Sequence, residues 1–139
     1  MIAIVCLDES RGMLFNHRRQ SRDLAVTDRI GRICRGKKVW MNSYSYPVYG
    51  ALEQVEIAVD PDFVGKAGQG DYCLVETECL EPVQEKLEGL LVFWWNRKYP
   101  ADFYLDLDLS QWKKVEAQEF SGVSHEKITE EFYVKAERI

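Results

Sequence analysis

The sequence predicts an α/β fold with a mixed, mostly parallel sheet, flanking helices and a C-terminal antiparallel hairpin. Three observations lead to this prediction. Short apolar runs alternate with helical patterns through most of the chain. The first run, residues 2–7, is apolar without interruption, as expected of a strand buried on both faces. Residues 113–120 and 128–136 instead alternate between apolar and polar side chains, which favours a hairpin.

The 139 residues fit one domain, residues 1–139, which can bury a core without disulfides or metals. Apolar residues make up 46% and charged residues 29%, so disorder is not expected. Apolar runs such as residues 90–95 are too short to span a bilayer, and the N-terminus lacks the pattern of a signal peptide. We therefore expect a cytoplasmic protein with no membrane partner and with four reduced, structural cysteines.

The strand over residues 2–7 leads into a polar loop over residues 8–20. A helix over residues 22–35 follows, because Ser21 offers an N-cap and Gly36 a C-terminal stop. Apolar residues recur along this helix at intervals of four and three positions and so form one buried face. These residues are Val26, Ile30 and Ile33.

Prolines, glycines and further apolar runs set the remaining elements. Pro47 and Pro82 mark the starts of two short helices, and Gly50 and Gly89 mark where they end. Residues 61–71 are rich in glycine and indicate a loop. The other strands are expected at residues 37–42, 55–60, 72–77 and 90–96.

Charge is distributed unevenly along the chain. Residues 1–38 carry nine Lys/Arg against four Asp/Glu, a surplus of five, whereas the remainder carries nine against nineteen, a deficit of ten. In the basic part, His17, Arg18, Arg19 and Arg22 form a cluster that would hold a phosphate or carboxylate; the alternative is a solvated loop. The net charge of −5 argues against a nucleic-acid partner, since phosphate neutralisation supplies most of that affinity.

Several common chemistries lack their residues in this sequence. The two histidines, His17 and His125, are too few for a His-rich metal hydrolase, and no Cys/His group has zinc spacing, so no metal is expected. A Gly-x-Ser-x-Gly nucleophile elbow and a phosphate-cradling loop are also absent from the sequence.

Several segments resemble the dihydrofolate reductases, in the order that this family has them. Residues 4–13 resemble the first strand and mobile loop of that family, and Arg22-Asp23-Leu24 its carboxylate–leucine pair at the first helix. Residues 36–42 resemble the glycine, second strand and methionine before the cofactor-phosphate turn. The C-terminal half agrees best, in segments that resemble the last crossover and the final hairpin. These segments are Tyr99–Leu105, Asp108–Trp112 and Phe132–Arg138.

The resemblance implies a folate-type site. In that family a buried carboxylate at the first helix binds the amino-pyrimidine edge of a pterin by two charge-assisted hydrogen bonds, which makes Asp23 the candidate catalytic residue. Cys6 and Thr27 would line the same pocket, and Ser45 would keep a hydroxyl in the phosphate turn. Arg19, with Arg18 beside it, is the ligand-binding candidate of the basic cluster. The alternatives are a helix N-terminal acid for Asp23 and core positions for Cys6 and Thr27.

The cofactor side departs from the family pattern. A Gly-Gly turn should let backbone N–H groups approach a pyrophosphate, but this sequence has no Gly-Gly, and the strand ends in Trp94 and Trp95. The helix that should follow this strand is missing, and residues 42–45 lack the arginine of the phosphate turn. On the folate side, residues 50–59 lack the arginine that holds the folate tail, and Phe103 replaces the threonine that supports the pterin-binding aspartate. The two tryptophans fill the volume that the missing helix would have occupied or, alternatively, form an aromatic platform for a ligand.

We therefore expect a diverged, shortened dihydrofolate reductase-like protein whose cofactor-binding half has been cut away. It would lack NADPH-dependent reductase activity, hold no cofactor and bind a small pterin-like or anionic ligand, as a monomer or homodimer. Two alternatives stay open: an active NADPH-dependent dihydrofolate or pterin reductase, and a non-catalytic dimeric interaction protein. Exposure of Trp94 or Trp95 would favour the interaction protein, and their burial a ligand-binding module or a fold without a site.

Overall fold

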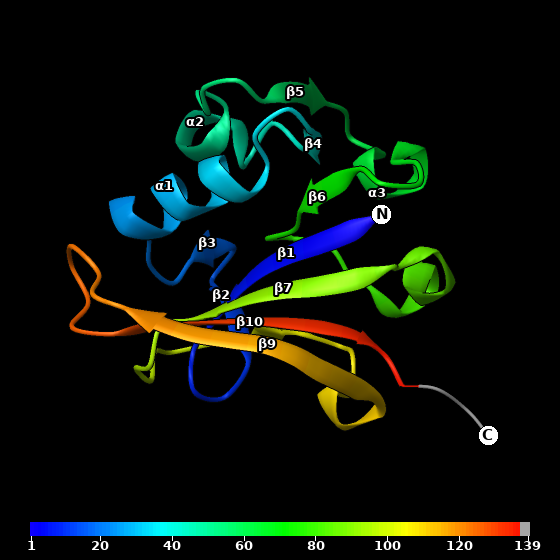
Figure 1. Cartoon of the computed structure of the whole chain (residues 1–139). Coiled ribbons are helices and arrows are strands. Elements are labelled where there is room, and N and C mark those ends of the chain that lie inside the picture. Colours follow the sequence, from blue (N-terminus) through cyan, green and yellow to red (C-terminus); the bar gives the residue numbers. More distant parts are fainter. Residues whose placement is uncertain (137–139) are drawn as a thin grey trace.

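The computed structural model describes residues 1–136 and is built around a seven-stranded sheet (Figure 1). The strand order is β5 (Glu56–Val59), β4 (Lys38–Met41), β6 (Tyr72–Leu74), β1 (Ile2–Leu7), β7 (Gly89–Trp94), β10 (Ile128–Lys135) and β9 (Trp112–Phe120). The first five strands in this order run parallel, and β10 pairs antiparallel with both β7 and β9. The predicted mixed, mostly parallel sheet with a C-terminal hairpin is confirmed.

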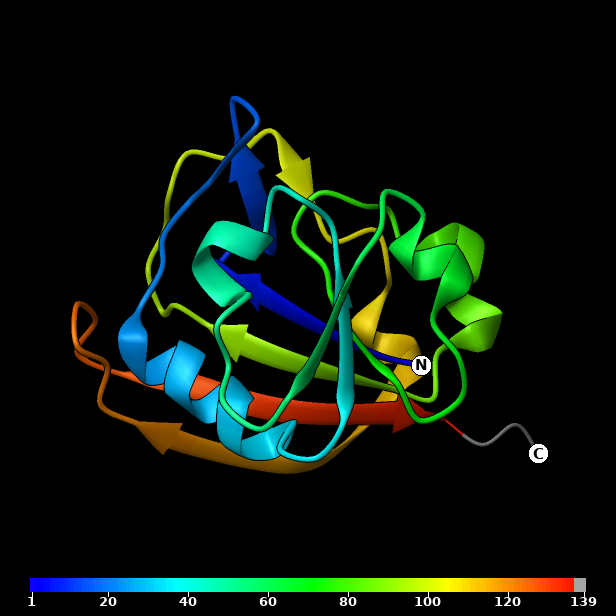
Figure 2. The same ribbon diagram turned by 90° about the horizontal axis from the view of Figure 1, so that it is seen from above.

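Both faces of the sheet are buried, which explains why the first strand is apolar without alternation. Along β1, Ala3 and Val5 belong to one hydrophobic cluster, whereas Ile4 belongs to a second cluster on the opposite face. The second cluster is covered by α1 (Leu24–Ile33) and α2 (Tyr46–Tyr49), seen over the sheet in Figure 2.

The first cluster is covered by short elements. Phe63 and Leu109 come from two of them and are buried there. These elements are α3 (Phe63–Lys66), two 3-10 helices η1 (Glu81–Lys86) and η2 (Leu109–Gln111), and a small sheet of β3 (Arg18–Arg19), β2 (Gly12–Phe15) and β8 (Phe103–Tyr104).

Helix α1 begins two residues later than the sequence indicates. Asp23, not Ser21, is the N-cap: its side chain accepts a hydrogen bond from the backbone N–H of Ala25 at 2.8 Å. The hydroxyl of Ser21 contacts His125 instead, so it is not available for capping. At the other end, Gly36 has a φ of 75°, the left-handed conformation that commonly stops a helix.

Segments expected to be loops contain short elements. The polar loop over residues 8–20 includes the β2–β3 hairpin, whose turn residues Asn16 and His17 have φ values of 51° and 62°, as a two-residue type I′ turn requires. Helix α3 lies within residues 61–71, and the second proline-led helix, η1, is 3-10 rather than α. Elements of two to six residues are too short to show a clear periodicity.

The end of the last family-like segment, Glu137 and Arg138, lies outside the described residues. Within residues 1–136, no helix combines the length and the apolar character needed to cross a membrane. All four cysteines are free thiols, of which Cys34 and Cys73 are buried.

Candidate functional site

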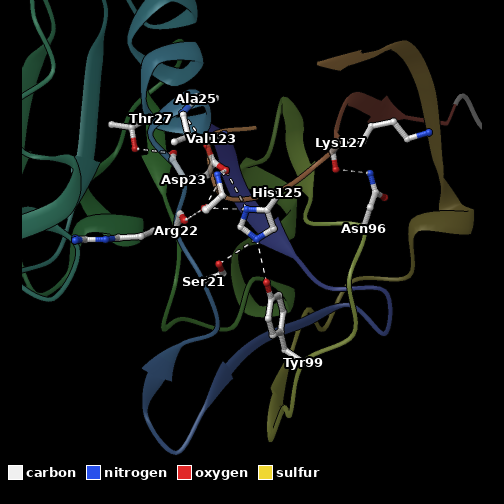
Figure 3. Close-up of polar contacts among 11 residues, drawn as sticks. Ser21, Arg22, Asp23, Ala25, Thr27, Asn96, Tyr99, Val123, His125 and Lys127 are labelled. Carbon is white, nitrogen blue, oxygen red and sulfur yellow. Dashed lines mark hydrogen bonds and ion pairs between the residues drawn. The ribbon is translucent and has the colours of Figure 1, made fainter. Parts of the chain in front are cut away.

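The candidate site lies where the N-terminus of α1 meets the loop between β9 and β10 (Figure 1). Asp23 caps the helix, and its carboxylate also accepts from the backbone N–H groups of Val123 and Ser124, both at 2.9 Å. The Nδ1 atom of His125 lies 2.9 Å from Oδ2 of Asp23 (Figure 3). One buried carboxylate thus holds a helix and a loop that lie about a hundred positions apart in the sequence.

Asp23 is fully used by the protein. The hydroxyl of Ser124 adds a further donor at 3.1 Å, so five groups of the protein donate to the two carboxylate oxygens. Burial by itself would raise the pKa of Asp23, but the hydrogen bonds from Val123, His125, Ser124 and Ala25 outweigh it and hold this pKa well below its usual range. Asp23 is therefore an ionised carboxylate in the core of the site.

Because an ionised carboxylate can only accept, Nδ1 of His125 carries a hydrogen and donates to Asp23. In the neutral ring, Nε2 is then an acceptor. The hydroxyls of Ser21 and Tyr99 lie 3.1 Å and 3.0 Å from it, on the side of the ring opposite Asp23 (Figure 3). The ring of Trp95 stacks on the imidazole at 4.7 Å between centroids and 22° between planes. An imidazole oriented by a carboxylate and bonded to hydroxyl groups has the arrangement of a general base.

A second buried carboxylate, Asp8, positions the neighbours of Ser21. It accepts from the backbone N–H of Tyr99 at 3.1 Å and from the side-chain amide of Gln20 at 3.2 Å. The backbone N–H of Gly12 donates to its other oxygen at 2.7 Å. Asp8 therefore fixes the backbone of Tyr99 and the residue before Ser21. Ser21 and Tyr99 are the two residues whose hydroxyls contact His125.

A small cavity of about 10 Å³ lies beside Ser21, at the carboxyl ends of β1, β6 and β7. This volume suits one water molecule. Gln20 lines the cavity, and its Oε1 atom is buried and has no hydrogen-bond partner within the described residues. The polar and sulfur-bearing side chains in the lining are Cys6, Met13, Arg19, Gln20, Ser21 and Glu76, with Trp95 beside them.

An ion pair closes one side of this cavity. Nε and Nη2 of Arg19 donate to the two carboxylate oxygens of Glu76 at 2.9 Å and 3.0 Å. The hydroxyl of Ser45 donates to the same carboxylate at 2.8 Å, and the guanidinium of Arg19 lies 4.6 Å from the centre of the Tyr44 ring. The hydrogen bond with Glu76 raises the pKa of Arg19, and burial raises the pKa of the Cys6 thiol.

Comparison with known proteins supports the fold. Neither a protein-family model nor a curated protein matches the chain. Among solved structures, the dihydrofolate reductase from Enterococcus faecalis complexed with NADP(H) and RAB-propyl is similar, with a TM-score of 0.69 and 12% identity. The match covers 98% of this chain and 96% of that chain. The fold is that of the dihydrofolate reductases.

The extent of this match corrects one expectation. Because it spans nearly the whole reductase chain, no half of the dihydrofolate reductase-like fold has been cut away. The expected departure lies after β7, where residues 95–102, all of them described, run on to β8 without a helix. Side chains occupy the end of β7, since Trp95 is 2% exposed and belongs to the core under α1.

The structure brings together some of the candidate residues that the sequence indicated, from the family resemblance and from the basic cluster. Cys6 and Arg19 line one cavity, and Ser45 reaches it through Glu76. Asp23 adjoins the same cavity through His125 and Ser21. Two further candidates do not line this cavity. The hydroxyl of Thr27 donates to the backbone oxygen of Asp23 at 3.3 Å, on an open groove of about 340 Å³ beside α1, and Arg18 is exposed on β3.

Sequence reasoning did not find the residues that surround Asp23 and the cavity. His125, Tyr99 and Glu76 were not singled out as site residues, and Ser21 was assigned to a helix cap. The sequence carries one signal: His125, one of two histidines, lies in the short Gly- and Ser-containing turn of the predicted hairpin. Within residues 1–136, no three His, Cys, Asp or Glu side chains gather to hold a metal ion.

Proposed function

We propose that this dihydrofolate reductase-like protein does not carry out NADPH-dependent reduction and that it binds a small anionic ligand beside the strand ends. The observation that carries the first part is Trp95. Where the family pattern requires glycine backbone to approach a dinucleotide pyrophosphate, this chain has a tryptophan that is 2% exposed and stacked on His125. A dinucleotide would have to displace this ring from the core.

Asp23 favours an anionic ligand over a pterin-like one. A pterin needs free carboxylate oxygens to accept from its amino-pyrimidine edge. The oxygens of Asp23 already accept from Ala25, Val123, Ser124 and His125, so a pterin would have to displace the loop between β9 and β10.

The anionic character rests on the basic cluster. Arg19 is committed to Glu76, but Arg18 and Arg22 are exposed and flank the segment that carries Ser21. Guanidinium groups bind phosphate and carboxylate oxygens by paired, charge-assisted hydrogen bonds. We assign the ligand to this flank of the site.

The tryptophans do not favour the interaction protein. Trp95 is buried, and Trp94 is half-buried with its indole N–H donating to Glu131. The alternative of an active reductase requires nicotinamide and pterin to be held in contact. The buried Trp95 opposes binding of the nicotinamide dinucleotide, and Asp23, whose oxygens already accept from protein donors, opposes binding of the pterin.

The reductase question is tested by dihydrofolate-dependent oxidation of NADPH, followed by absorbance, and by titrating NADPH while following tryptophan fluorescence. We expect no turnover and no saturable change. A dissociation constant in the low micromolar range would contradict the proposal, as would turnover that disappears in an Asp23→Asn variant whose melting transition remains cooperative.

Ligand binding is tested by melting the protein in phosphate, in a small dicarboxylate and with a pterin, because a ligand that binds only the folded state raises the melting temperature. We expect the anions to stabilise the native protein and not an Arg18→Ala/Arg22→Ala variant. Arg35→Ala, at an exposed arginine beyond the other end of α1, is the control and should respond as the native protein does. Stabilisation by the pterin alone, or by no anion, would contradict the proposal.

A further inference from the structure

We infer that Ser21 is a nucleophile, activated by His125 and Asp23, that accepts a small acyl group from an activated ester. This inference rests on the part of the proposed function that places a small ligand beside Ser21, and not on the absence of reductase activity.

The three side chains form a connected line of hydrogen bonds. Oδ2 of Asp23 lies 2.9 Å from Nδ1 of His125, and Nε2 of the same ring lies 3.1 Å from Oγ of Ser21 (Figure 3). A hydroxyl, an imidazole and a carboxylate in this order make a nucleophile, its base and the group that orients the base. The arrangement is recognised by geometry and roles rather than by sequence order, so the absence of a nucleophile elbow does not oppose it.

The base is held rigidly. Asp23 cannot turn away, because four further donors of the protein hold its oxygens. Trp95 packs on the face of the imidazole, which prevents the ring from leaving the plane in which Nε2 faces Ser21. Such preorganisation is what a general base needs, since no energy is then spent on orienting it during reaction.

Tyr99 is a positioning residue in this scheme. Nε2 has one lone pair and accepts from one hydroxyl at a time, so Ser21 and Tyr99 share it. Once the ring has taken the proton of Ser21, its new N–H can donate to the oxygen of Tyr99 at 3.0 Å. The backbone of Tyr99 is fixed by Asp8 at 3.1 Å, which keeps this second partner in place.

The cavity supplies room for the water that completes the reaction. Ser21 and Gln20 both line it, and its volume of about 10 Å³ suits one water. Oε1 of Gln20 is buried and has no partner among the described residues. An acceptor of this kind would hold a water beside Oγ of Ser21.

The chemistry balances with the ester and one water as the only reactants. Oγ of Ser21 forms a bond to the carbonyl carbon of the ester while its proton passes to Nε2 of His125. The bond from carbon to the leaving oxygen breaks, and His125 returns the proton to that oxygen, which releases the alcohol. Water then attacks the acyl-serine in the same way, which releases the carboxylic acid and restores Ser21.

The test uses phenylmethylsulfonyl fluoride, which transfers its sulfonyl group to an activated serine while fluoride and a proton leave. We expect intact mass and peptide mapping to show one label, on Ser21, and none in Ser21→Ala. Ser110 is the matched control: it is exposed and its hydroxyl lies 2.7 Å from the carboxylate of Asp108, with no imidazole. Ser110→Ala should be labelled as the native protein is.

Two further measurements separate a reactive serine from a structural one. Native protein should release p-nitrophenol from p-nitrophenyl acetate about tenfold faster or more than Ser21→Ala, with Ser110→Ala retaining this activity. In Ser21→Cys, iodoacetamide should alkylate the new thiol about tenfold faster or more than the thiol of Ser110→Cys, because His125 promotes the thiolate.

Equal labelling in Ser21→Ala, a label on another residue, or equal alkylation of the two introduced cysteines would overturn the inference. Failure here is distinguishable from failure of the proposed function. Anion-dependent melting without labelling would reject only the nucleophile, and labelling without any anion effect would reject only the anionic ligand.

Discussion

Asp23 and His125 are 102 positions apart in the sequence, yet the carboxylate of one accepts the Nδ1 hydrogen of the other at 2.9 Å in a site where both side chains are buried. This contact joins the first turn of α1 to the loop of the C-terminal hairpin. The β9–β10 hairpin is therefore tied to the helical face as well as, through β10, to β7. The site is consequently part of what holds the fold together, which gives its residues measurable effects on stability.

Asp23→Asn should lower the free energy of unfolding by about 3 kcal/mol, because a buried, charged acceptor of five hydrogen bonds becomes a neutral amide whose N–H₂ opposes other donors. Urea unfolding followed by tryptophan fluorescence measures this change. Asp28→Asn is the matched control: that carboxylate lies one turn along the same helix and is 79% exposed, so its loss should change stability little. Equal effects of the two substitutions would contradict the role of Asp23.

The contribution of Asp23 should depend on pH in a direction fixed by its pKa. This pKa is depressed in the folded protein relative to about 4 in an unfolded chain. The stability that the ionised form provides is therefore complete above about pH 4 and is lost as pH falls below it toward the folded pKa. The difference in unfolding free energy between the native protein and Asp23→Asn should be largest near neutrality and shrink below about pH 4. If the difference in unfolding free energy between the two proteins did not change with pH, the charge of Asp23 would not contribute to stability.

Gly122→Ala should destabilise the protein by about 2 kcal/mol, because overpacking moves the loop away from Asp23. A Cβ atom at Gly122 would lie 2.6 Å from Oδ2 of Asp23 and 2.7 Å from the backbone oxygen of His125. Gly31→Ala is the control and should change stability in the opposite direction. Its Cβ would meet only Leu52, at 3.5 Å, and alanine is more stable than glycine within a helix by roughly 0.5–1 kcal/mol. Thermal melts of both variants check the sign, and stabilisation by Gly122→Ala would refute the close approach.

Glu76→Gln should cost about 2 kcal/mol of unfolding free energy, since it leaves the guanidinium of Arg19 and the hydroxyl of Ser45 without their charged acceptor. The side chains of Arg19 and Glu76 are only 21% and 13% exposed. In contrast, Glu119→Gln breaks an ion pair with Lys127 in which both side chains are more than half exposed, and it should cost less than about 0.5 kcal/mol. Chemical denaturation of the two variants compares them directly.

Local patterns in the sequence determined the main elements of this protein. Uninterrupted apolar residues predicted β1, helical spacing of Val26 and Ile30 predicted the buried face of α1, and alternation predicted the β9–β10 hairpin. These features are visible locally because burial of one or both faces imposes a period on consecutive residues. The order of these elements indicated the mixed α/β class, and segments that resemble the dihydrofolate reductases in the family's order indicated that fold.

The tertiary structure alone decided how the site is assembled. Ser21 and Asp23 are equally suitable helix caps by residue type, and the choice between them depends on His125, which lies on a distant loop. The short strands β2, β3 and β8 and the cavity partners Arg19 and Glu76 depend in the same way on contacts between segments that are far apart. No spacing in the sequence encodes such contacts, because hydrogen bonds between distant side chains form only after packing of the sheet has brought their backbones together.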